Sequence, residues 1–265
     1  MVYTTKVYKS DPDILNIDDG GSIEVAEGGS IVLPSGRNLG EKGVPSLVEW
    51  IDDFLGDVID DSYSAAKGSD GQGVIATITQ AACGVVRLTA ADEGSSDAAN
   101  LSVLTHGLNW KANQGNLTLV TRFKLESAAN VAFFIGFTDV LATTTLEAPF
   151  TLATTSYTSN ASDACGILYD TAATTDTIRA VGVAADTDAT HVDTSLVPDT
   201  SWHTLRIHVG STGTMTVYYD GTLVATVAAA VTATVALTPV VAITGRTTTT
   251  KYIDVDYLAV RATRA

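Results

Sequence analysis

The chain has 265 residues, of which 30 are acidic and 15 are basic, so its formal net charge at neutral pH is −15. An acidic surface repels phosphate backbones and the Lys and Arg residues are scattered singly, so we expect no binding to nucleic acid. With 45% hydrophobic residues the chain is not a disordered acidic tail, and its length suffices for one large β domain or two small ones.

The chain carries no sequence signal for export or membrane insertion. Residues 1–6 lack the apolar run of a secretory signal peptide. The longest weakly polar stretch, residues 223–237, is interrupted by threonines and is shorter than the roughly 20 residues of a membrane helix, so we expect no membrane association. The two cysteines, Cys83 and Cys165, are too few for a disulfide framework or a zinc site. They are interpreted as buried thiols, with a single bridge between them as the alternative.

Residues 1–45 differ from the rest because they repeat a unit of eight residues. One copy, Gly-Gly-Ser-Ile-Glu-Val, begins at Gly20, and the second, Gly-Gly-Ser-Ile-Val-Leu, begins at Gly28. Within each copy, apolar residues alternate after a Gly-Gly turn, which is typical of a short strand. The alternating apolar residues are Ile23, Val25, Ile31 and Leu33.

Two such strands do not hold together alone in water, so they must add to another sheet. The candidates are the body of the same chain, a second copy of the chain, and the sheet edge of another protein. A loosely ordered leader is the alternative. We favour an assembly arm at residues 1–45, joined by a Gly-rich linker to a body at residues 46–265.

Residues 47–59 carry apolar side chains at helical spacing, among them Leu47, Trp50, Ile51 and Phe54. This periodicity predicts a helix, although the same run can also open a sheet.

From residue 74 onward, short runs rich in β-branched and aromatic residues alternate with clusters of Gly, Asn and Asp. About twelve such strands follow one another without a convincing helix, which argues for an antiparallel sandwich. The clearest part is 201–227, where Leu205, Ile207 and Val209 share one face. Asp220 and Gly221 suit a type I′ hairpin turn, so we predict a three-stranded meander here.

Three segments carry a resemblance to a known family. They are Trp-His-Thr-Leu-Arg-Ile at 202–207 with Val-Tyr-Tyr-Asp-Gly at 217–221, Ile-Asp-Val-Asp-Tyr-Leu-Ala-Val at 253–260, and Asp-Asp-Phe-Leu-Gly at 52–56. The first two resemble the hairpin and the closing strand of the concanavalin A-like (laminin-G-like) jelly-roll superfamily. The third resembles the opening strand of versions in tailed-phage structural proteins. The resemblance implies an all-β antiparallel jelly-roll sandwich over about residues 48–263, with a strand rather than a helix at residues 49–54.

A Gly-rich repeat arm in front of such a domain is similar to phage capsid decoration proteins and head fibres. The resemblance implies a virion surface protein made in the host cytoplasm, first of all a capsid decoration or cement protein. Its partners would be the major capsid protein or another virion protein, and a homotrimer is the favoured assembly. A fibre or tail component comes next. The competing hypothesis is a carbohydrate-binding adhesin module that attaches particles to cell-surface glycans.

The family also includes glycosidases, in which paired carboxylates stand on one strand in a Glu-x-Asp-x-x-Glu run. No such run occurs in this sequence. Asp254 and Asp256 share a strand face, but the resemblance places them in the structural closing strand. We also find no Gly-x-Ser-x-Gly elbow. The sequence therefore predicts no catalytic residue and a protein that is not an enzyme.

Two sets of loop residues are candidates for ligand binding. Laminin-G-like domains often hold one calcium at a loop edge, and Asp186, Asp188 and Asp193 offer carboxylates for it; solvated acidic loops are the alternative. No other cofactor is expected. Lectin-type sites use exposed aromatics and Asp or Asn at the rim of the sandwich. The glycan candidates are Trp110, Tyr157, Asn160 and Tyr169.

Overall fold

The computed structural model describes residues 7–11, 14–17, 31–32, 38–39, 47–56, 58–67, 73–78, 84–90, 101–142 and 147–264. The chain divides into two units, Met1–Pro45 and Ser46–Ala265. Among the described residues, the one helical element is a 3-10 turn at Ala112–Gln114, and no helix there has the length and hydrophobicity to cross a membrane.

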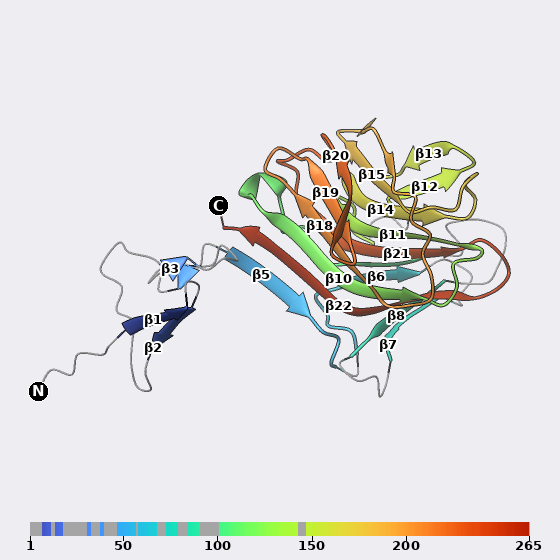
Figure 1. Ribbon diagram of the computed structural model, residues 1–265. Helices are drawn as coiled ribbons and strands as arrows, with labels where there is room; N and C mark the ends of the chain where they lie inside the picture. Colours follow the sequence, from blue (N-terminus) through green and yellow to red (C-terminus); the bar gives the residue numbers. More distant parts are fainter. Residues whose placement is uncertain are drawn as a thin grey trace, which may run out of the picture. The chain divides into compact units, whose positions relative to one another are not determined.

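The Met1–Pro45 unit contains two pairs of short antiparallel strands (Figure 1). β1 (Val7–Asp11) pairs with β2 (Ile14–Ile17), and β3 (Ile31–Val32) pairs with β4 (Asn38–Leu39). Ile31 of the proposed arm contacts therefore lies in a strand, whereas Ile23, Val25 and Leu33 lie outside the described residues. Isolated two-stranded ribbons are marginally stable in water, so further pairing would stabilise them.

The Ser46–Ala265 unit is built on two antiparallel sheets of eight strands each (Figure 1). In the first, which we call the β10 sheet, the order is β20-β19-β18-β10-β22-β8-β7, with β5 also paired to β22. Its strands are β5 (Leu47–Asp52), β7 (Val74–Thr77), β8 (Val86–Ala90), β10 (Leu117–Leu125), β18 (His203–Val209), β19 (Met215–Tyr219), β20 (Thr222–Val227) and β22 (Lys251–Thr263).

In the second, which we call the β11 sheet, the order is β16-β15-β14-β11-β21-β9-β6, with β17 also paired to β15. Its strands are β6 (Ser64–Lys67), β9 (Leu101–Thr105), β11 (Val131–Thr138), β14 (Ala164–Asp170), β15 (Arg179–Ala184), β16 (Thr187–Asp188), β17 (Val192–Asp193) and β21 (Thr238–Gly245). The predicted all-β antiparallel jelly-roll sandwich is confirmed.

The main core lies between the two sheets. Along β10, buried residues such as Leu119 and Phe123 alternate with half-buried ones, as expected for a strand with one face in a core and one toward solvent. Phe133 and Ile135 of β11 meet them from the opposite sheet, and the Phe123 and Phe133 rings lie 5.6 Å apart. The alternation seen in the sequence therefore places the core correctly.

The β11 sheet is buried on both faces, unlike the β10 sheet. Its outward side chains, among them Phe134 and Leu168, form a second apolar cluster with Phe150 and Leu152 of a covering hairpin. That hairpin consists of β12 (Phe150–Ala153) and β13 (Ser156–Ser159). The hairpin and its flanking segments thus close the outer face of this sheet.

Residues 47–59 do not form the helix that their periodicity predicts. Residues 47–52 form β5, which pairs antiparallel with β22, so this segment is a strand as the resemblance implied, although it ends at Asp52 rather than at residue 54. Trp50 and Asp52 lie opposite the buried Val260 and Leu258, whereas the intervening Ile51 is 54% exposed. The apolar spacing arises because this strand carries hydrophobic residues on both faces, which mimics a helical stripe.

The predicted meander at 201–227 is present as β18, β19 and β20. Asp220 and Gly221 have φ of 48° and 79°, as a type I′ turn requires. Asp220 also accepts a hydrogen bond from the Thr204 amide at 2.8 Å, and its second oxygen lies 2.8 Å from His203 Nδ1. His203 Nε2 lies 2.9 Å from Asp199, so the imidazole sits between two carboxylates.

We expect His203→Gln to destabilise the protein more at pH 5.5 than at pH 9. Burial lowers the pKa of His203, but the hydrogen bonds to Asp220 and Asp199 outweigh it, so the net pKa is raised. A raised folded-state pKa stabilises the fold below the unfolded pKa of about 6.5, and this contribution is lost as pH rises through the folded value. The two aspartates are half exposed, so we expect a loss of about 1 kcal/mol at low pH, or about 2–4 °C in melting temperature. An equal loss at both pH values in thermal melts would contradict this assignment.

Candidate functional site

A large cavity lies at the end of β5, within the Ser46–Ala265 unit. Its volume is about 640 Å³, inside the range of roughly 300–1,000 Å³ typical of small-molecule sites. It is formed by β5, the loop that leads to β6, and the residue that follows β9. The lining residues are Trp50, Ile51, Asp52, Phe54, Gly56, Val58, Ile59, Asp60, Ser62 and His106.

Aromatic rings form one side of this site. The Trp50 and His106 rings lie 4.2 Å apart between centroids with an angle of 32° between their planes. Tyr63 packs edge-on against both rings, at 5.5 Å from Trp50 and 5.7 Å from His106. Phe54 is buried at the start of the loop, where it adopts a positive φ of 50°. The rings are thereby held by one another and by the edge of the main core.

Two carboxylates lie on the polar side of the cavity, and each one organises a turn. Asp52 accepts the Phe54 amide at 2.7 Å, and Asp60 accepts the Ser62 amide at 2.7 Å. In each case the bond uses Oδ1. Hydrogen bonds from the Ser62 side chain and backbone hold the pKa of Asp60 below its usual value, so this carboxylate is ionised at neutral pH.

The two other titratable rings at this site are Tyr63 and His106. His106 Nδ1 is buried without a hydrogen-bond partner in the described part of the chain, and the buried Tyr63 Oη lies near the Asp52 carboxylate. Burial, with the nearby Asp52 charge, raises the pKa of Tyr63, and burial lowers the pKa of His106 despite the two aspartates. Both groups are therefore neutral at pH 7, and each retains unused capacity for hydrogen bonding.

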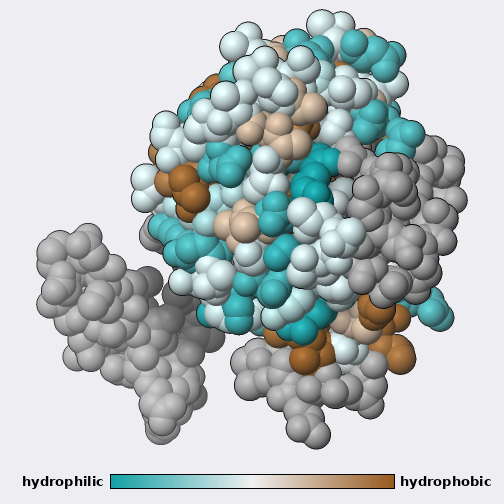
Figure 2. Space-filling model, turned by 90° about the vertical axis from the view of Figure 1, so that its right-hand side faces the viewer, coloured by the Kyte–Doolittle hydropathy of each residue, from teal (hydrophilic) through white to brown (hydrophobic). Residues whose placement is uncertain are grey.

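Exposed hydrophobic side chains gather around this cavity. Seven large ones occur among the described residues, and three of them, Ile51, Leu55 and Val58, lie in β5 or the loop after it. Val58 is 79% exposed. On the face drawn in Figure 2, by contrast, most described surface is hydrophilic or neutral and hydrophobic patches are small.

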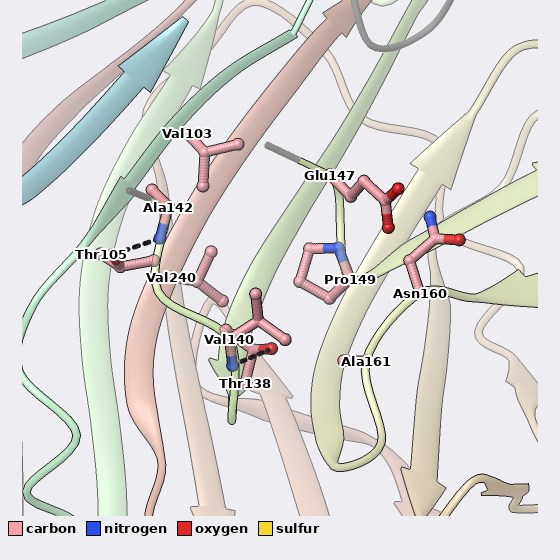
Figure 3. Close-up of a pocket in the computed structure, with 10 residues that line it drawn as sticks. All are labelled: Val103, Thr105, Thr138, Val140, Ala142, Glu147, Pro149, Asn160, Ala161 and Val240. Atoms are coloured by element: carbon pink, nitrogen blue, oxygen red, sulfur yellow. Dashed lines mark hydrogen bonds between the residues drawn. The ribbon is translucent and has the colours of Figure 1, made fainter. Parts of the chain in front are cut away.

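Among the described residues, the pocket on the outer face of the β11 sheet is much smaller. Figure 3 shows a pocket there between Val103, Val140 and Val240, with Glu147 and Asn160 near its polar side. Its volume is about 10 Å³, room for about one water molecule. Hydrogen bonds from the Ala142 and Val140 amides to Thr105 and Thr138 fix the adjoining segment (Figure 3). This small pocket is a packing defect in the cover rather than a ligand site.

On the outward face of the β10 sheet, the two aspartates that share a strand in the sequence are each bound by an arginine. Asp254 receives two hydrogen bonds from Arg87 of β8, at 2.6 and 2.8 Å. Asp256 receives one from Arg122 of β10, at 2.9 Å. Since β8 and β10 flank β22 on opposite sides, the two carboxylates are engaged by different neighbours.

The four glycan candidates from the sequence do not come together as one exposed group. Trp110 and Tyr169 are buried in the main core, and the Tyr169 hydroxyl donates to the Ala128 carbonyl at 2.8 Å. Tyr157 of β13 packs edge-on against His191, and the Asn160 amide donates to the Ala148 carbonyl at 2.9 Å. The rings of Trp110 and Tyr169 therefore serve packing.

Two of the three calcium candidates are engaged by different partners, and the third is exposed. Asp186 accepts the Ser162 hydroxyl at 2.7 Å, Asp193 pairs with Arg179 at 3.2 Å, and Asp188 lies exposed in β16. No group of three or more His, Cys, Asp or Glu converges as a metal site in the part of the chain that is described. Of the cysteines, Cys165 is a buried free thiol whose pKa burial raises to about 12, and Cys83 lies outside the described residues.

No family model matches the sequence, and no curated protein matches it. Solved structures do match in fold. The β-glucanase of Bacillus licheniformis is 14% identical, with a TM-score of 0.53 over 82% of this chain and 98% of that one. The Emp47p carbohydrate recognition domain is 9% identical, with a TM-score of 0.54 over 82% and 95%. The pseudo β-1,3-glucanase of Mycobacterium tuberculosis is 12% identical, with a TM-score of 0.56 over 83% and 100%.

These neighbours are lectin-like and glucanase-like jelly-roll domains, which agrees with the concanavalin A-like resemblance. They also correct one prediction. Several of them are glycoside hydrolases, including a β-1,3-glucanase from Mycobacterium marinum and a β-1,3-1,4-glucanase from a mouse hindgut metagenome. The prediction that this chain is not an enzyme is therefore wrong. The missing Glu-x-Asp-x-x-Glu run rules out one arrangement of carboxylates, whereas the fold itself is one that glucanases use.

Proposed function

We propose that this chain is a surface protein of a tailed-phage particle, of the capsid decoration type, attached through Met1–Pro45. The proposal rests on the division of the chain into two units of different kinds. A closed sandwich is preceded by a separate unit of short strand pairs, which gain stability by pairing with a further sheet edge. The Asp-Asp-Phe-Leu-Gly run at 52–56 and the Gly-Gly repeat support the link to phage structural proteins.

In this proposal the arm binds by strand addition. Main-chain hydrogen bonds to the major capsid protein, or to another virion protein, supply affinity, and the apolar residues of the repeat fill pockets beside the new strand. Copies of the arm also pair with one another, giving a homotrimer. The net charge of −15 keeps many crowded copies apart on the particle surface and in the host cytoplasm before assembly.

Immunogold electron microscopy tests this assignment directly. With antibodies raised against the full chain, we expect gold on the heads of particles purified from a culture in which the gene is expressed. Labelling confined to tails or fibres would show that the protein is a tail or fibre component rather than a capsid decoration protein. Particles without any label, despite expression of the protein in the infected cells, would contradict the virion assignment.

Carbohydrate binding is the second candidate, and the cavity beneath β5 favours it. This site combines aromatic rings with carboxylates in the manner of sites that hold sugars. The named lectin and glucanase neighbours share the fold that presents it here. A glycan array probed with the full chain tests the binding, and release of reducing ends from the bound glycan, measured in parallel, tests for hydrolysis.

A further inference from the structure

We infer that the cavity formed by Trp50, Asp52, Asp60, Ser62 and His106 binds a sugar unit of a neutral glycan. The inference rests on carbohydrate binding, the second of the proposed functions, and assigns it to a site. The four glycan candidates taken from the sequence lie elsewhere and are largely engaged in packing. The cavity lies where β5 ends and the chain leads on to β6.

The shape and the rings suit a pyranose. A pyranose ring has an apolar face of C–H groups and an equatorial rim of hydroxyls. In this inference the Trp50 ring supplies a large flat surface for the apolar face of the sugar. The stacked His106 ring and the edge-on Tyr63 ring fix the orientation of Trp50. Since these rings are already held in place, little conformational entropy is lost when a ligand binds.

The polar groups suit the hydroxyls. Asp52 and Asp60 each accept a backbone amide of their own turn on Oδ1, and the Ser62 side chain also hydrogen-bonds Asp60. A carboxylate oxygen accepts strong hydrogen bonds from sugar hydroxyls. Beside them, His106 lines the cavity, and its Nδ1 is buried without a hydrogen-bond partner among the described residues. A buried polar atom without a partner at a cavity indicates bound water or a ligand.

The charge of the site selects the class of glycan. The lining contains two aspartates and no Lys or Arg among the residues described. The whole chain adds a net charge of −15. Carboxylates would repel the acid groups of sialic or uronic acids at short range. The expected ligand is therefore a neutral hexose or N-acetylhexosamine unit, with Ile51 and Val58 at the rim contacting the adjoining residues of the glycan.

The experiment uses the full chain and four variants, one of them a control, on an array of neutral and acidic glycans. The neutral glycan that binds best is then titrated by calorimetry. Trp50→Ala is expected to weaken binding at least about 10-fold, because a central aromatic anchor is removed, and Trp50→Phe should retain most of the affinity. Asp60→Asn, at an exposed turn, is expected to weaken binding about 10-fold through loss of a charged acceptor.

Trp202→Ala is the matched control. Trp202 lies against Arg122 and Lys124 on the outward face of the β10 sheet, on the other side from Trp50. It should leave the affinity within about twofold of the parent chain, and circular dichroism confirms that each variant is folded.

Three results would overturn the inference. If a neutral glycan binds but folded Trp50→Ala and Asp60→Asn bind it as tightly as the parent, the site lies elsewhere while carbohydrate binding stands. If only acidic glycans bind, the assigned class is wrong. If the parent chain binds no glycan on the array, both the site and the second proposed function fail.

Discussion

Replacing Arg246 by leucine is expected to lower the free energy of unfolding by about 3–5 kcal/mol. The Asp170 side chain is completely buried and receives the Arg246 guanidinium on both oxygens, with Nε at 2.9 Å from Oδ1. Asp170 also accepts the Leu152 and Ala172 amides, at 3.2 and 3.0 Å. Leucine at position 246 would leave a buried carboxylate without its counter-charge.

The loss would also affect the cover of the β11 sheet, because Leu152 belongs to β12 of the covering hairpin. For a unit of this size the change corresponds to a drop of roughly 6–20 °C in melting temperature. Thermal and urea unfolding followed by circular dichroism would measure it.

Arg122→Leu is the matched control. The Arg122 side chain is 43% exposed and pairs with Asp256 on the outward face of the β10 sheet, so its removal should cost about 1 kcal/mol or less. If Arg246→Leu proves no more destabilising than Arg122→Leu, the buried pair does not hold the hairpin as described.

Much of the fold could be predicted because the sequence repeats one simple signal. Alternation in 201–227 places Leu205 and Ile207 in the core, and Asp220–Gly221 fixes the turn between β19 and β20. The strand β5 was harder, since Trp50 faces inward while Ile51 faces solvent, and both are apolar. Local periodicity cannot separate such a strand from a helix, and only the resemblance of residues 52–56 pointed to a sheet.

The candidate site could not be predicted, since it depends on packing between distant segments. Trp50 and His106 stand 56 positions apart in the chain and stack because β5 and β9 end near the same edge of the sandwich. Conversely, Trp110 and Tyr169 are aromatic residues near polar segments, as expected for an exposed glycan site, and the sequence does not reveal that both are buried. Tyr169 instead lies on the inner face of the β11 sheet, where its ring stacks on Phe133 in the main core.

The largest functional effect is expected from the arm. Replacing Ile31 and Leu33 together by aspartate should weaken attachment to the particle more than about 100-fold. Each buried apolar side chain of this size contributes roughly 1.5–3 kcal/mol, and 2.7 kcal/mol already corresponds to about 100-fold. The stability of the Ser46–Ala265 unit should not change, because the substitutions fall in the other unit.

A matched pair of substitutions controls for the added charge. Val197 and Leu223 are 67% and 53% exposed on the body, so Val197→Asp with Leu223→Asp adds the same two charges without touching the arm. This control variant should attach as the parent does.

Co-sedimentation with particles that lack this protein is the most direct test of attachment through Met1–Pro45. The account predicts that the full chain and the body-substituted control pellet with the particles. The arm-substituted variant and a chain shortened by residues 1–45 should stay in the supernatant while melting at the parent temperature. Pelleting of the shortened chain at the level of the full chain would contradict the assignment of the arm.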